Sequence, residues 1–422
     1  MEVLIVYYEA SRSISVFGEY DVVVVGGGFA GVSAALSAAR NGVSVCLIEK
    51  ACALGGLGTL GLVVDYLPLC DGLGYQMVGG IGEELMLGVS KYDCSSPPDC
   101  WSDSSLPQQR RKKRYELTYN PSAMVLLMEE LLIDAGVVLF YDTRFSSILK
   151  KENIIEAVIV ENKSGRGAIL CKHVVDASGD ADVCYTAGEE TIDSDQNVCA
   201  WWFYTEAENG THLNRKTDNF YKITPETKTY SGTKHEDVSA LCIDTRSRIR
   251  TYLQACAGAS GELGFSFQSM AHDGQSLNRD ALPKERQIPA ILPTIPQFRM
   301  TRRLQSSFVM DISHCGKWFE DSIGMTGDWR KSGPRYCLPY SVIRAKNTSN
   351  LLCAGRCIST TYALQDVTRV IPTCAVTGEA AGVAAALAVK NKESDLSKID
   401  ISQLQNILKN QGVLFAPELF DK

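Results

Sequence analysis

One stretch near the start of the chain, DVVVVGGGFAGVSAALSAARNGVSVCLIEK (residues 21–50), limits the fold more than any other. Its four valines predict a short strand that is buried on both faces, and Gly26-x-Gly28-x-x-Gly31 follows directly. Gly26 permits a tight turn, Gly28 lets backbone N–H groups approach a pyrophosphate, and Gly31 lets the next helix pack on the strand. We expect that helix from about Ala30 to Arg40, with the N–H groups of its first turn directed at the phosphates. The sequence therefore predicts a unit that binds a dinucleotide.

The second predicted strand, VSVCLIE, ends in Glu49, whose carboxylate can accept hydrogen bonds from a ribose diol. The charge of Glu49 would repel the 2′-phosphate of NADP, which leaves NAD or FAD. The glycine spacing alone does not separate these two cofactors. A second formal match, Gly56-x-Gly58-x-x-Gly61, has no apolar strand before it, and we interpret it as a loop.

Composition argues against several other functions. The 422 residues carry a net charge of −7, which disfavours nucleic acid or an anionic membrane surface as the main partner. The basic run RRKKR (residues 110–114) lies in a polar stretch that is typical of a solvated loop. No apolar run reaches the roughly 18 residues that a bilayer requires. The best candidate is interrupted by Glu379 and two glycines.

Two features favour a cytoplasmic location. The first residues lack the basic start and the small-residue cleavage site of a signal peptide. The 15 cysteines are scattered through apolar runs, a pattern that suits reduced thiols better than a disulfide framework.

The rest of the chain alternates helices and strands. Asn120 and Pro121 predict the start of a helix, because asparagine caps a helix and proline fits its first position. Four segments rich in β-formers follow, VVLFYD, FSSILKK, IIEAVIVEN and GAILCKHVVDASGD, and short polar turns join the last three. They predict a small antiparallel meander that interrupts the parallel sheet. A polar stretch over residues 205–237 indicates a domain boundary or a lid-like insertion.

Five segments together resemble the FAD-dependent oxidoreductases of the glutathione-reductase-like superfamily, near the fumarate reductase and succinate dehydrogenase flavoproteins. The five segments are EYDVVVVGGGFAGVSAALSAARNG, LGGLGTLG, VVDASGDADV, FRMTRRLQSSFVMD and LPYSVIRAKNTSNLLCAGRCIS with RVIPTCAVTGEAAGVAAALAV. They stand in the family's order and span most of the chain. The resemblance implies an α/β fold with a Rossmann-like FAD-binding domain, in which a β-meander accompanies the parallel sheet. We expect this domain at residues 18–195 and 335–422, an inserted α+β substrate domain at 196–334, and an N-terminal extension at 1–17.

The resemblance implies FAD as the cofactor, contacted by the glycine turns of ASGD and AGR and by the helix after Pro372. We expect non-covalent FAD, because the first histidine, His173, is too far along the chain to form the family's tether near the first glycine unit. Small residues in GEAAGVAAALA would let the flavin ring approach, and close helix packing without a ligand is the alternative for that run. The expected FAD-binding residues are Gly26, Gly28, Phe29, Ala30, Gly31, Glu49, Lys50, Gly55, Gly56, Gly179, Asp180, Gly355, Arg356, Thr373, Gly378 and Ala381.

Flavin dehydrogenases of this type bind carboxylates with arginine and histidine, and they move protons through Arg, His or Tyr. The catalytic candidates on that basis are Arg302, Arg303, His314, Tyr340 and Arg369, with His272 as a weaker choice. A salt bridge or phosphate clamp is the alternative for each arginine, and a structural role is the alternative for His314. The catalytic motif of fumarate reductases is not recognisable here, which argues against fumarate-like substrates.

Cysteine placement argues against two further chemistries. Cys46, Cys52 and Cys70 give no redox pair beside the glycine loop, so we discount disulfide reduction. The absence of CxxC spacing argues against iron–sulfur and zinc sites, and we expect no metal.

We therefore expect an enzyme that transfers a hydride between flavin N5 and a small organic substrate at a C–OH, C–N or C=C bond. A flavoprotein without net redox turnover, such as an isomerase or dehydratase, is one alternative, and an FAD-bound scaffold or sensor is another. The expected partners are a small-molecule substrate and an unknown electron acceptor or donor. A homo-oligomer is left open, and neither nucleic acid nor a membrane is expected as a partner.

Overall fold

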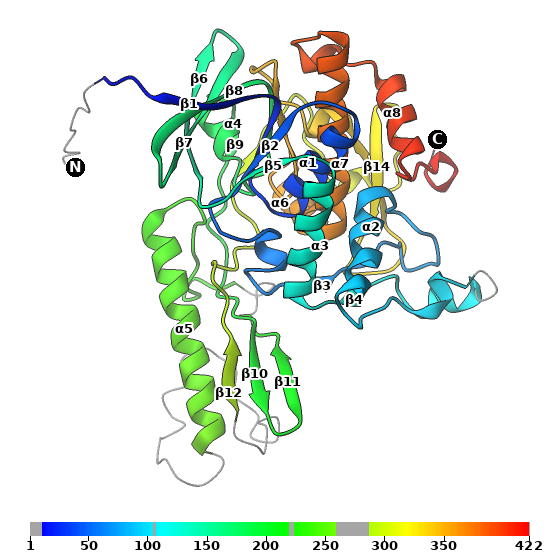
Figure 1. Ribbon diagram of the computed structural model, residues 1–422. Coiled ribbons are helices and arrows are strands. Elements are labelled where there is room, and N and C mark those ends of the chain that lie inside the picture. The colour runs from blue at the N-terminus through cyan, green and yellow to red at the C-terminus, as the bar shows by residue number, and fades with distance from the viewer. Residues whose placement is uncertain (1–10, 104–106, 219–222, 259–286, 422) are drawn as a thin grey trace.

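The computed structural model describes residues 11–421, apart from 104–106, 219–222 and 259–286. Its centre is a seven-stranded sheet in the order β5-β2-β1-β8-β7-β6, with β16 also paired to β8 (Figure 1). The parallel strands of this sheet are β1 (Ser15–Val25), β2 (Val45–Ile48), β5 (Val138–Phe140), β8 (Gly165–Asp176) and β16 (Leu351–Cys353). The antiparallel meander is formed by β6 (Arg144–Lys151) and β7 (Ile154–Asn162) beside β8. The predicted combination of a parallel sheet and a meander is confirmed.

The valines of β1 explain why the strand lies in the middle of the sheet. Val22 and Val24 belong to the larger hydrophobic core, whereas Val23 and Val25 belong to a second core on the other face. Successive side chains of a strand point to opposite faces, so four consecutive apolar residues require a cover on both sides. On the face of the larger core this cover includes α1 (Phe29–Arg40), α3 (Pro121–Asp134) and α7 (Ile371–Asn391).

The termini of α1 and α3 follow the sequence signals. The side chain of Asn120 accepts hydrogen bonds from the N–H groups of Ser122 and Ala123, and Pro121 begins α3. Asn41 ends α1, and Gly42 follows with a φ of +77°. The main body also contains α2 (Gly80–Gly88), α4 (Asp182–Thr186), α6 (Tyr362–Thr368) and α8 (Ile401–Asn410).

A separate lobe projects from the body of the molecule, at the bottom of Figure 1. It contains the three-stranded sheet of β10 (Phe203–Ala207), β11 (Gly210–Asn214) and β12 (Ile288–Ile291), with α5 (His235–Gly258) beside it. Two small hydrophobic clusters hold this lobe together. The short strand pairs outside it are β3 (Asp65–Tyr66) with β4 (Leu117–Thr118), β9 (Thr191–Ile192) with β13 (Arg303–Leu304), and β14 (Ser322–Gly327) with β15 (Arg335–Pro339).

Two of the expected domain boundaries disagree with the strands. The boundary at residue 18 falls inside β1, which begins at Ser15. The boundary at 335 separates β14 from its hairpin partner β15, and Met310, Ile323 and Met325 belong to the larger core. The chain therefore returns from the lobe to the main body before residue 310, because apolar side chains of the segment after it complete the core under the sheet.

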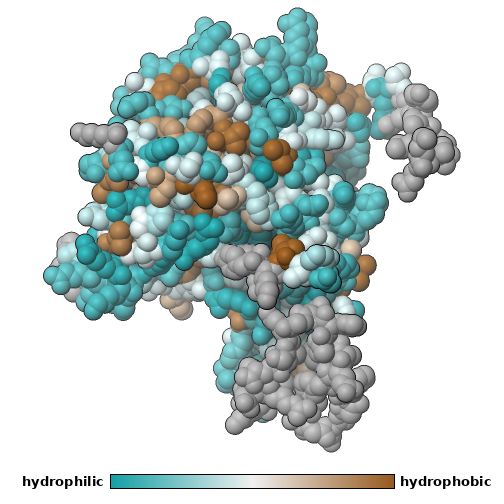
Figure 2. All heavy atoms as spheres, turned by 180° about the vertical axis from the view of Figure 1, so that it is seen from behind, coloured by the Kyte–Doolittle hydropathy of each residue, from teal (hydrophilic) through white to brown (hydrophobic). Residues whose placement is uncertain are grey.

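Helix α7 is long and apolar enough to cross a bilayer by length and composition, but 89% of its apolar window is buried inside the protein. We interpret α7 as a core helix. On the face turned away in Figure 1, hydrophobic residues form separate clusters among hydrophilic ones (Figure 2).

Candidate functional site

The turn between β1 and α1 leaves open space in front of one glycine only. An added Cβ at Gly31 would overlap the carbonyl oxygen of Gly26, and one at Gly26 would overlap that of Ala177. An added Cβ at Gly28 would meet no atom within 4 Å. No side chain of the described residues caps α1, so its first-turn N–H groups face this space without a partner. The turn can therefore hold a phosphate against the positive end of the helix dipole.

Glu49 and Lys50 follow β2 beside this turn. One carboxylate oxygen of Glu49 accepts the N–H of Gly27 at 2.7 Å, and the other accepts the N–H of Ala51 at 2.8 Å. Each oxygen keeps a second lone pair, so the contact with a ribose stays a prediction. Phe29 can offer a ligand only its backbone, because its ring packs against Tyr66 in the core.

The second run of glycines lies against the first. The N–H of Gly55 donates to the carbonyl of Gly27 at 2.7 Å, and Gly55 and Gly56 have φ values of +97° and +53°. An added Cβ at Gly56 would lie 3.4 Å from the Cα of Gly28. Gly56–Gly58 forms a short 3-10 turn, which confirms that the second formal glycine match is a loop.

The ASGD and AGR turns meet at the carboxyl ends of β8 and β16. Gly179 and Gly355 have φ values of +82° and +90°, where only glycine is relaxed. The guanidinium of Arg356 donates to the carbonyl of Gly179 at 2.6 Å and to the carboxylate of Asp180 at 2.7 Å. An added Cβ at Gly355 would lie 2.9 Å from the Cβ of Ala30, so the AGR turn adjoins the start of α1. Segments far apart in the sequence thus converge on one edge of the sheet.

Helix α7 packs on α1 through its own glycines. An added Cβ at Gly378 would overlap the carbonyl of Ala30, and one at Gly382 would overlap that of Ala34. The expectation that a flavin ring approaches Gly378 and Ala381 is wrong for this reason: Gly378 is occupied by α1, and Ala381 is fully buried in the larger core. Close helix packing, the alternative for this run, is what the structure shows.

The contacts between α1 and α7 also determine how far the N-termini of the two helices are offset along the helix direction. Gly378 matches Ala30 and Gly382 matches Ala34, so the two helices run in the same direction. The start of α7 at Ile371 therefore lies about 9 Å ahead of the start of α1, at 1.5 Å of rise per residue. No described side chain caps α7 either. The positive N-terminal ends of α1 and α7 therefore lie one after the other along this edge of the sheet. An extended ligand with a phosphate at α1 and an electron-rich group at α7 fits this arrangement.

Comparison with known proteins agrees with this geometry. Residues 21–196 and 189–408 match the family described as FAD dependent oxidoreductase. The chain belongs to this family. FAD is therefore the cofactor, and the enzyme is an FAD-dependent oxidoreductase.

Solved structures of flavoproteins and related enzymes are similar at low identity. A geranylgeranyl bacteriochlorophyll reductase-like protein from Thermoplasma acidophilum is 11% identical, with a TM-score of 0.45 over 93% of this chain and 84% of that chain. p-Nitrophenol 4-monooxygenase from Pseudomonas putida is 12% identical, with a TM-score of 0.46 over 95% and 82%. A 3-ketosteroid dehydrogenase from Rhodococcus jostii is 14% identical, with a TM-score of 0.41 over 88% and 98%. These values are too low to indicate a substrate for this FAD-dependent oxidoreductase.

Of the catalytic candidates, Arg302 lies beside the ASGD turn and Arg369 lies just before α7. Arg302 donates to the carbonyl of Asp180 at 2.8 Å and to the carboxylate of Asp182 at 2.7 Å, beside the ASGD turn. Burial, followed by the negative charges of Asp180 and Asp176, raises the pKa of Asp182 to about 6. The positive charge of Arg302 acts in the opposite direction. Arg302 is thus committed to a salt bridge, the alternative considered for it.

Arg369 precedes the N-terminal end of α7. Its guanidinium donates to the carboxylate of Asp366 at 2.5 Å and lies over the ring of Trp329. Thr373, in the first turn of α7, shares a hydrogen bond of 2.8 Å with Thr326 and is fully buried. Thr373 can therefore offer FAD its backbone but not its side chain.

The other three candidates have structural roles, and we correct them. Arg303 is buried and donates to the carbonyl of Thr360. His314 accepts the N–H of Asp311 in a capping box. Tyr340 is buried and donates to the carbonyl of Leu396 at 3.0 Å. His272 lies outside the described residues.

Two features of the site were missed from the sequence. The first is Arg299, one of whose terminal nitrogens, Nη1, is buried without a hydrogen-bond partner among the described residues. The second is a pair of buried thiols around the AGR turn, Cys353 and Cys357, with their sulfur atoms 3.5 Å apart. This pair is distant from the cysteines near the first glycine loop, and the CAGRC spacing is the sequence signal that indicates it. Hydrogen bonding to the thiols of Cys184 and Cys357, and then burial, raises the pKa of Cys353 well above its ordinary value, which makes the Cys353 thiol unreactive.

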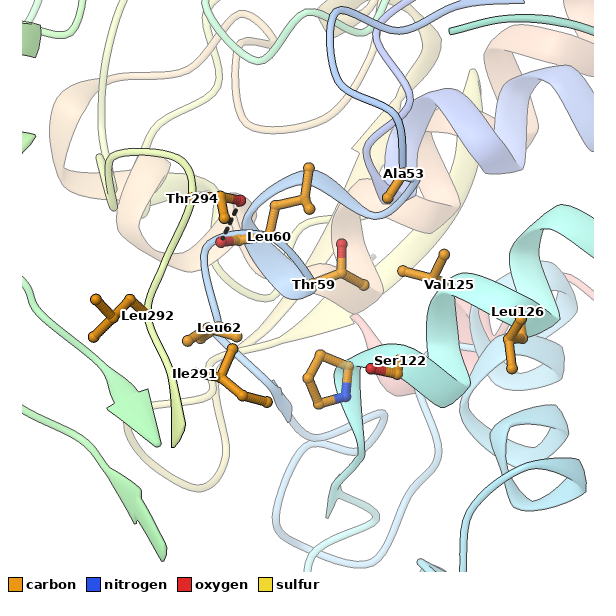
Figure 3. A pocket seen from close by; sticks show the side chains of 11 residues that line it. Ala53, Thr59, Leu60, Leu62, Ser122, Val125, Leu126, Ile291, Leu292 and Thr294 are labelled. Atoms are coloured by element: carbon orange, nitrogen blue, oxygen red, sulfur yellow. Dashed lines mark hydrogen bonds between the residues drawn. The ribbon is translucent and has the colours of Figure 1, made fainter. Parts of the chain in front are cut away.

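A cavity of about 400 Å³ lies beside the loop that contains the second run of glycines (Figure 3). It is bounded by the loop after β2, by the first turns of α3 and by the chain after β12, where the N–H of Thr294 donates to the carbonyl of Leu60 at 2.9 Å. Its lining is apolar apart from three hydroxyl groups and contains no ionisable side chain. The cavity therefore supplies no acid or base to the reaction.

Proposed function

We propose that this FAD-dependent oxidoreductase is a dehydrogenase or reductase that transfers a hydride between flavin N5 and a small organic substrate at a C–OH, C–N or C=C bond. FAD, when bound, supplies the hydride-accepting or hydride-donating centre. The observation that carries the proposal is the pair of uncapped helix N-termini at one sheet edge, which are offset by about 9 Å along the direction of the helices.

The chain's own residues would divide the work between the two helix ends. At α1, the backbone N–H groups around Gly28 would hold the pyrophosphate, since no side chain fills the space there. At α7, the helix dipole and the nearby guanidinium of Arg369 would stabilise negative charge on the reduced cofactor. The buried Asp366 and the half-buried Trp329 beside Arg369 would restrict water at that end.

Anaerobic mixing of the purified yellow protein with candidate alcohols, amines and enes tests the proposal. Loss of the flavin absorption band on mixing, and its return when air is admitted, is the expected result. Turnover without loss of the band would instead favour an isomerase or dehydratase. FAD binding without turnover of any candidate would favour a scaffold. Release of the flavin into the supernatant on acid precipitation is expected if FAD is non-covalent.

A further inference from the structure

Arg299 is a half-buried cation that is hydrogen-bonded to no described carboxylate. Its Nη1 nitrogen has no hydrogen-bond partner in the described part of the chain, and its guanidinium lies 5.4 Å from the centre of the Trp202 ring. Burial lowers its pKa to about 9, and the charges of Arg369 and Arg356 act in the same direction. The charges of Asp366 and Asp65 oppose this shift, but neither carboxylate is hydrogen-bonded to Arg299. A guanidinium rarely gives up its proton in a protein, so the buried Nη1 can take an anionic partner from outside the chain.

The neighbouring carboxylates are already used by other arginines. Asp180 pairs with Arg356 at 2.7 Å. Asp366 accepts from Arg369 at 2.5 Å and from Arg330 at 3.1 Å. One negative charge is thus shared by two guanidinium groups, although Arg330 also reaches Asp328 at 2.8 Å. No described carboxylate within hydrogen-bond distance remains for Arg299.

The backbone around Arg299 is fixed to the FAD site on both sides. The side chain of Asn197 accepts the N–H of Arg299 at 3.1 Å. Arg356 donates to the carbonyl of Phe298 at 2.7 Å, and the hydroxyl of Thr301 donates to the carbonyl of Gly179 at 3.0 Å. Arg299 is therefore held against the ASGD and AGR turns rather than carried on a free loop, as a preorganised binding group requires.

The cofactor's own phosphates do not fit this position. Oxidised FAD is negatively charged only at its pyrophosphate, and the open space and free N–H groups for that group lie at α1. Arg299 instead lies close enough to Arg369 for the two positive charges to repel each other. Arg369 precedes the start of α7, which is offset by about 9 Å from the start of α1 along the direction of the helices. The segment that carries Arg299 comes from the projecting lobe through β12, not from the glycine turns.

We infer that Arg299 binds a carboxylate group of the substrate at the α7 end of the FAD site. This inference rests on the proposed function and adds the substrate class to it. The planar guanidinium offers parallel N–H donors that match a carboxylate, and Trp202 on one face keeps the guanidinium in its plane. Arg369 and the helix dipole would add favourable potential for the same charge.

The test measures carboxylate binding to the oxidised, FAD-loaded protein without turnover. Sodium acetate, succinate and benzoate are titrated against sodium chloride at equal ionic strength, and the change in the flavin absorption band is followed. The variants are Arg299→Gln and Arg299→Lys, with Arg215→Gln as the matched control. Arg215 also lies over the ring of Trp202, at 5.7 Å, but it is paired with Asp65 at 2.7 Å.

At least one carboxylate should perturb the flavin band of the wild type and of Arg215→Gln with equal affinity, and methyl esters should not. Arg299→Gln should weaken this binding about tenfold or more, as loss of a charge-assisted pair does, and Arg299→Lys should restore part of it. FAD content and melting temperature, measured on the same samples, should be close to wild type. Equal binding by Arg299→Gln, binding of the methyl esters, or no response to any of the carboxylates would overturn the inference. Loss of FAD from Arg299→Gln would also overturn it and would assign the charge to the cofactor. Failure of hydride transfer alone would contradict the proposed function but not this binding result.

Discussion

Glu379 and Arg299 each have a buried polar atom without a hydrogen-bond partner among the described residues, and they differ in what surrounds them. Glu379 lies in the middle of α7, where one carboxylate oxygen accepts the N–H of Ile81 at 2.9 Å and the other has no partner among the described residues. It is enclosed by Gly80 at the start of α2, whose added Cβ would overlap it. Arg299 is half-buried, and it lies in the segment that is hydrogen-bonded to the ASGD and AGR turns.

The difference shows how each group is compensated. A carboxyl group can take up a proton and become neutral, so Glu379 needs no ligand, and burial raises its pKa to about 8. A guanidinium cannot be neutralised in this way at physiological pH. The middle of α7 therefore contains a neutral acid that belongs to the core, whereas Arg299, which lies outside α7, is a permanent cation. The predictions below test this contrast.

The largest effect should come from Glu379. Because its folded pKa is raised from about 4.5 to about 8, the folded state keeps a proton that the unfolded chain releases. Its contribution to stability is complete below pH 4.5 and is lost as the pH rises to about 8. The loss is about 1.4 kcal/mol per pH unit and about 5 kcal/mol in all. The neutral variant Glu379→Gln should lack this slope, as urea unfolding at a series of pH values would show.

Glu84→Gln is the control for this measurement. Glu84 lies near Glu379, but it is about one-third exposed and paired with Arg40 on the surface. Its removal should leave the pH dependence of unfolding close to wild type. If Glu379→Gln keeps the wild-type slope, Glu379 is ionised in the folded protein and the contrast with Arg299 fails.

Substitutions at three glycines distinguish a role in helix packing from a role in cofactor binding. Gly31→Ala and Gly378→Ala should each lower the free energy of unfolding by about 3 kcal/mol, because the new methyl group overlaps a backbone carbonyl. Gly28→Ala should change stability by at most about 1 kcal/mol, since nothing lies within 4 Å of the new atom. Its FAD affinity should nevertheless fall about tenfold, which is worth about 1.4 kcal/mol. Fluorescence titration with FAD, next to thermal unfolding, distinguishes the two classes; equal behaviour of all three variants would contradict the assignment of the open space to a phosphate.

The fold was largely predictable because its signals are local. The valines of β1, the glycine turn, the asparagine cap of α3 and the alternating strands of the meander each have a periodicity or turn chemistry of their own. The domain boundary at 335 was wrong because the β14–β15 hairpin and the core contacts of Met310 depend on tertiary packing. No local pattern marks them.

The site was less predictable than the fold. The glycines of the turns were found, since positive φ and close approach leave a recognisable residue type. Gly378 was misassigned, because a small residue that receives a ring and one that receives a helix look the same in sequence. Arg299 was missed because it differs from Arg302 and Arg303 only in lacking an acceptor, and that is visible only once Asp180, Asp182 and Thr360 are placed.

Arg356 should matter more for the site than Arg302, although both donate to the ASGD turn. Arg356 connects the carbonyl of Gly179, the carboxylate of Asp180 and the carbonyl of Phe298. Arg356→Gln should therefore lower the free energy of unfolding by about 2 kcal/mol and reduce bound FAD. Arg302→Gln should have a smaller effect on FAD content, because its carboxylate partner Asp182 is not itself part of either glycine turn. Equal FAD loss in both variants would show that the two turns are not held together by Arg356.

The smallest effects should come from His314 and Tyr340, two of the three candidates to which the structure gives structural roles. His314→Ala loses the hydrogen bond to the N–H of Asp311 and should cost about 1 kcal/mol of unfolding free energy, as caps of this kind do. Tyr340→Phe should cost a similar amount, because the carbonyl of Leu396 loses its donor. Neither side chain faces the helix ends at the sheet edge, so the rate of flavin reduction and its pH profile should stay within about twofold of wild type. A shifted pH profile in His314→Ala, measured by stopped-flow absorbance with any substrate that reduces the flavin, would return His314 to the proton-transfer path and would weaken the case that the charged chemistry is confined to the arginines beside α7.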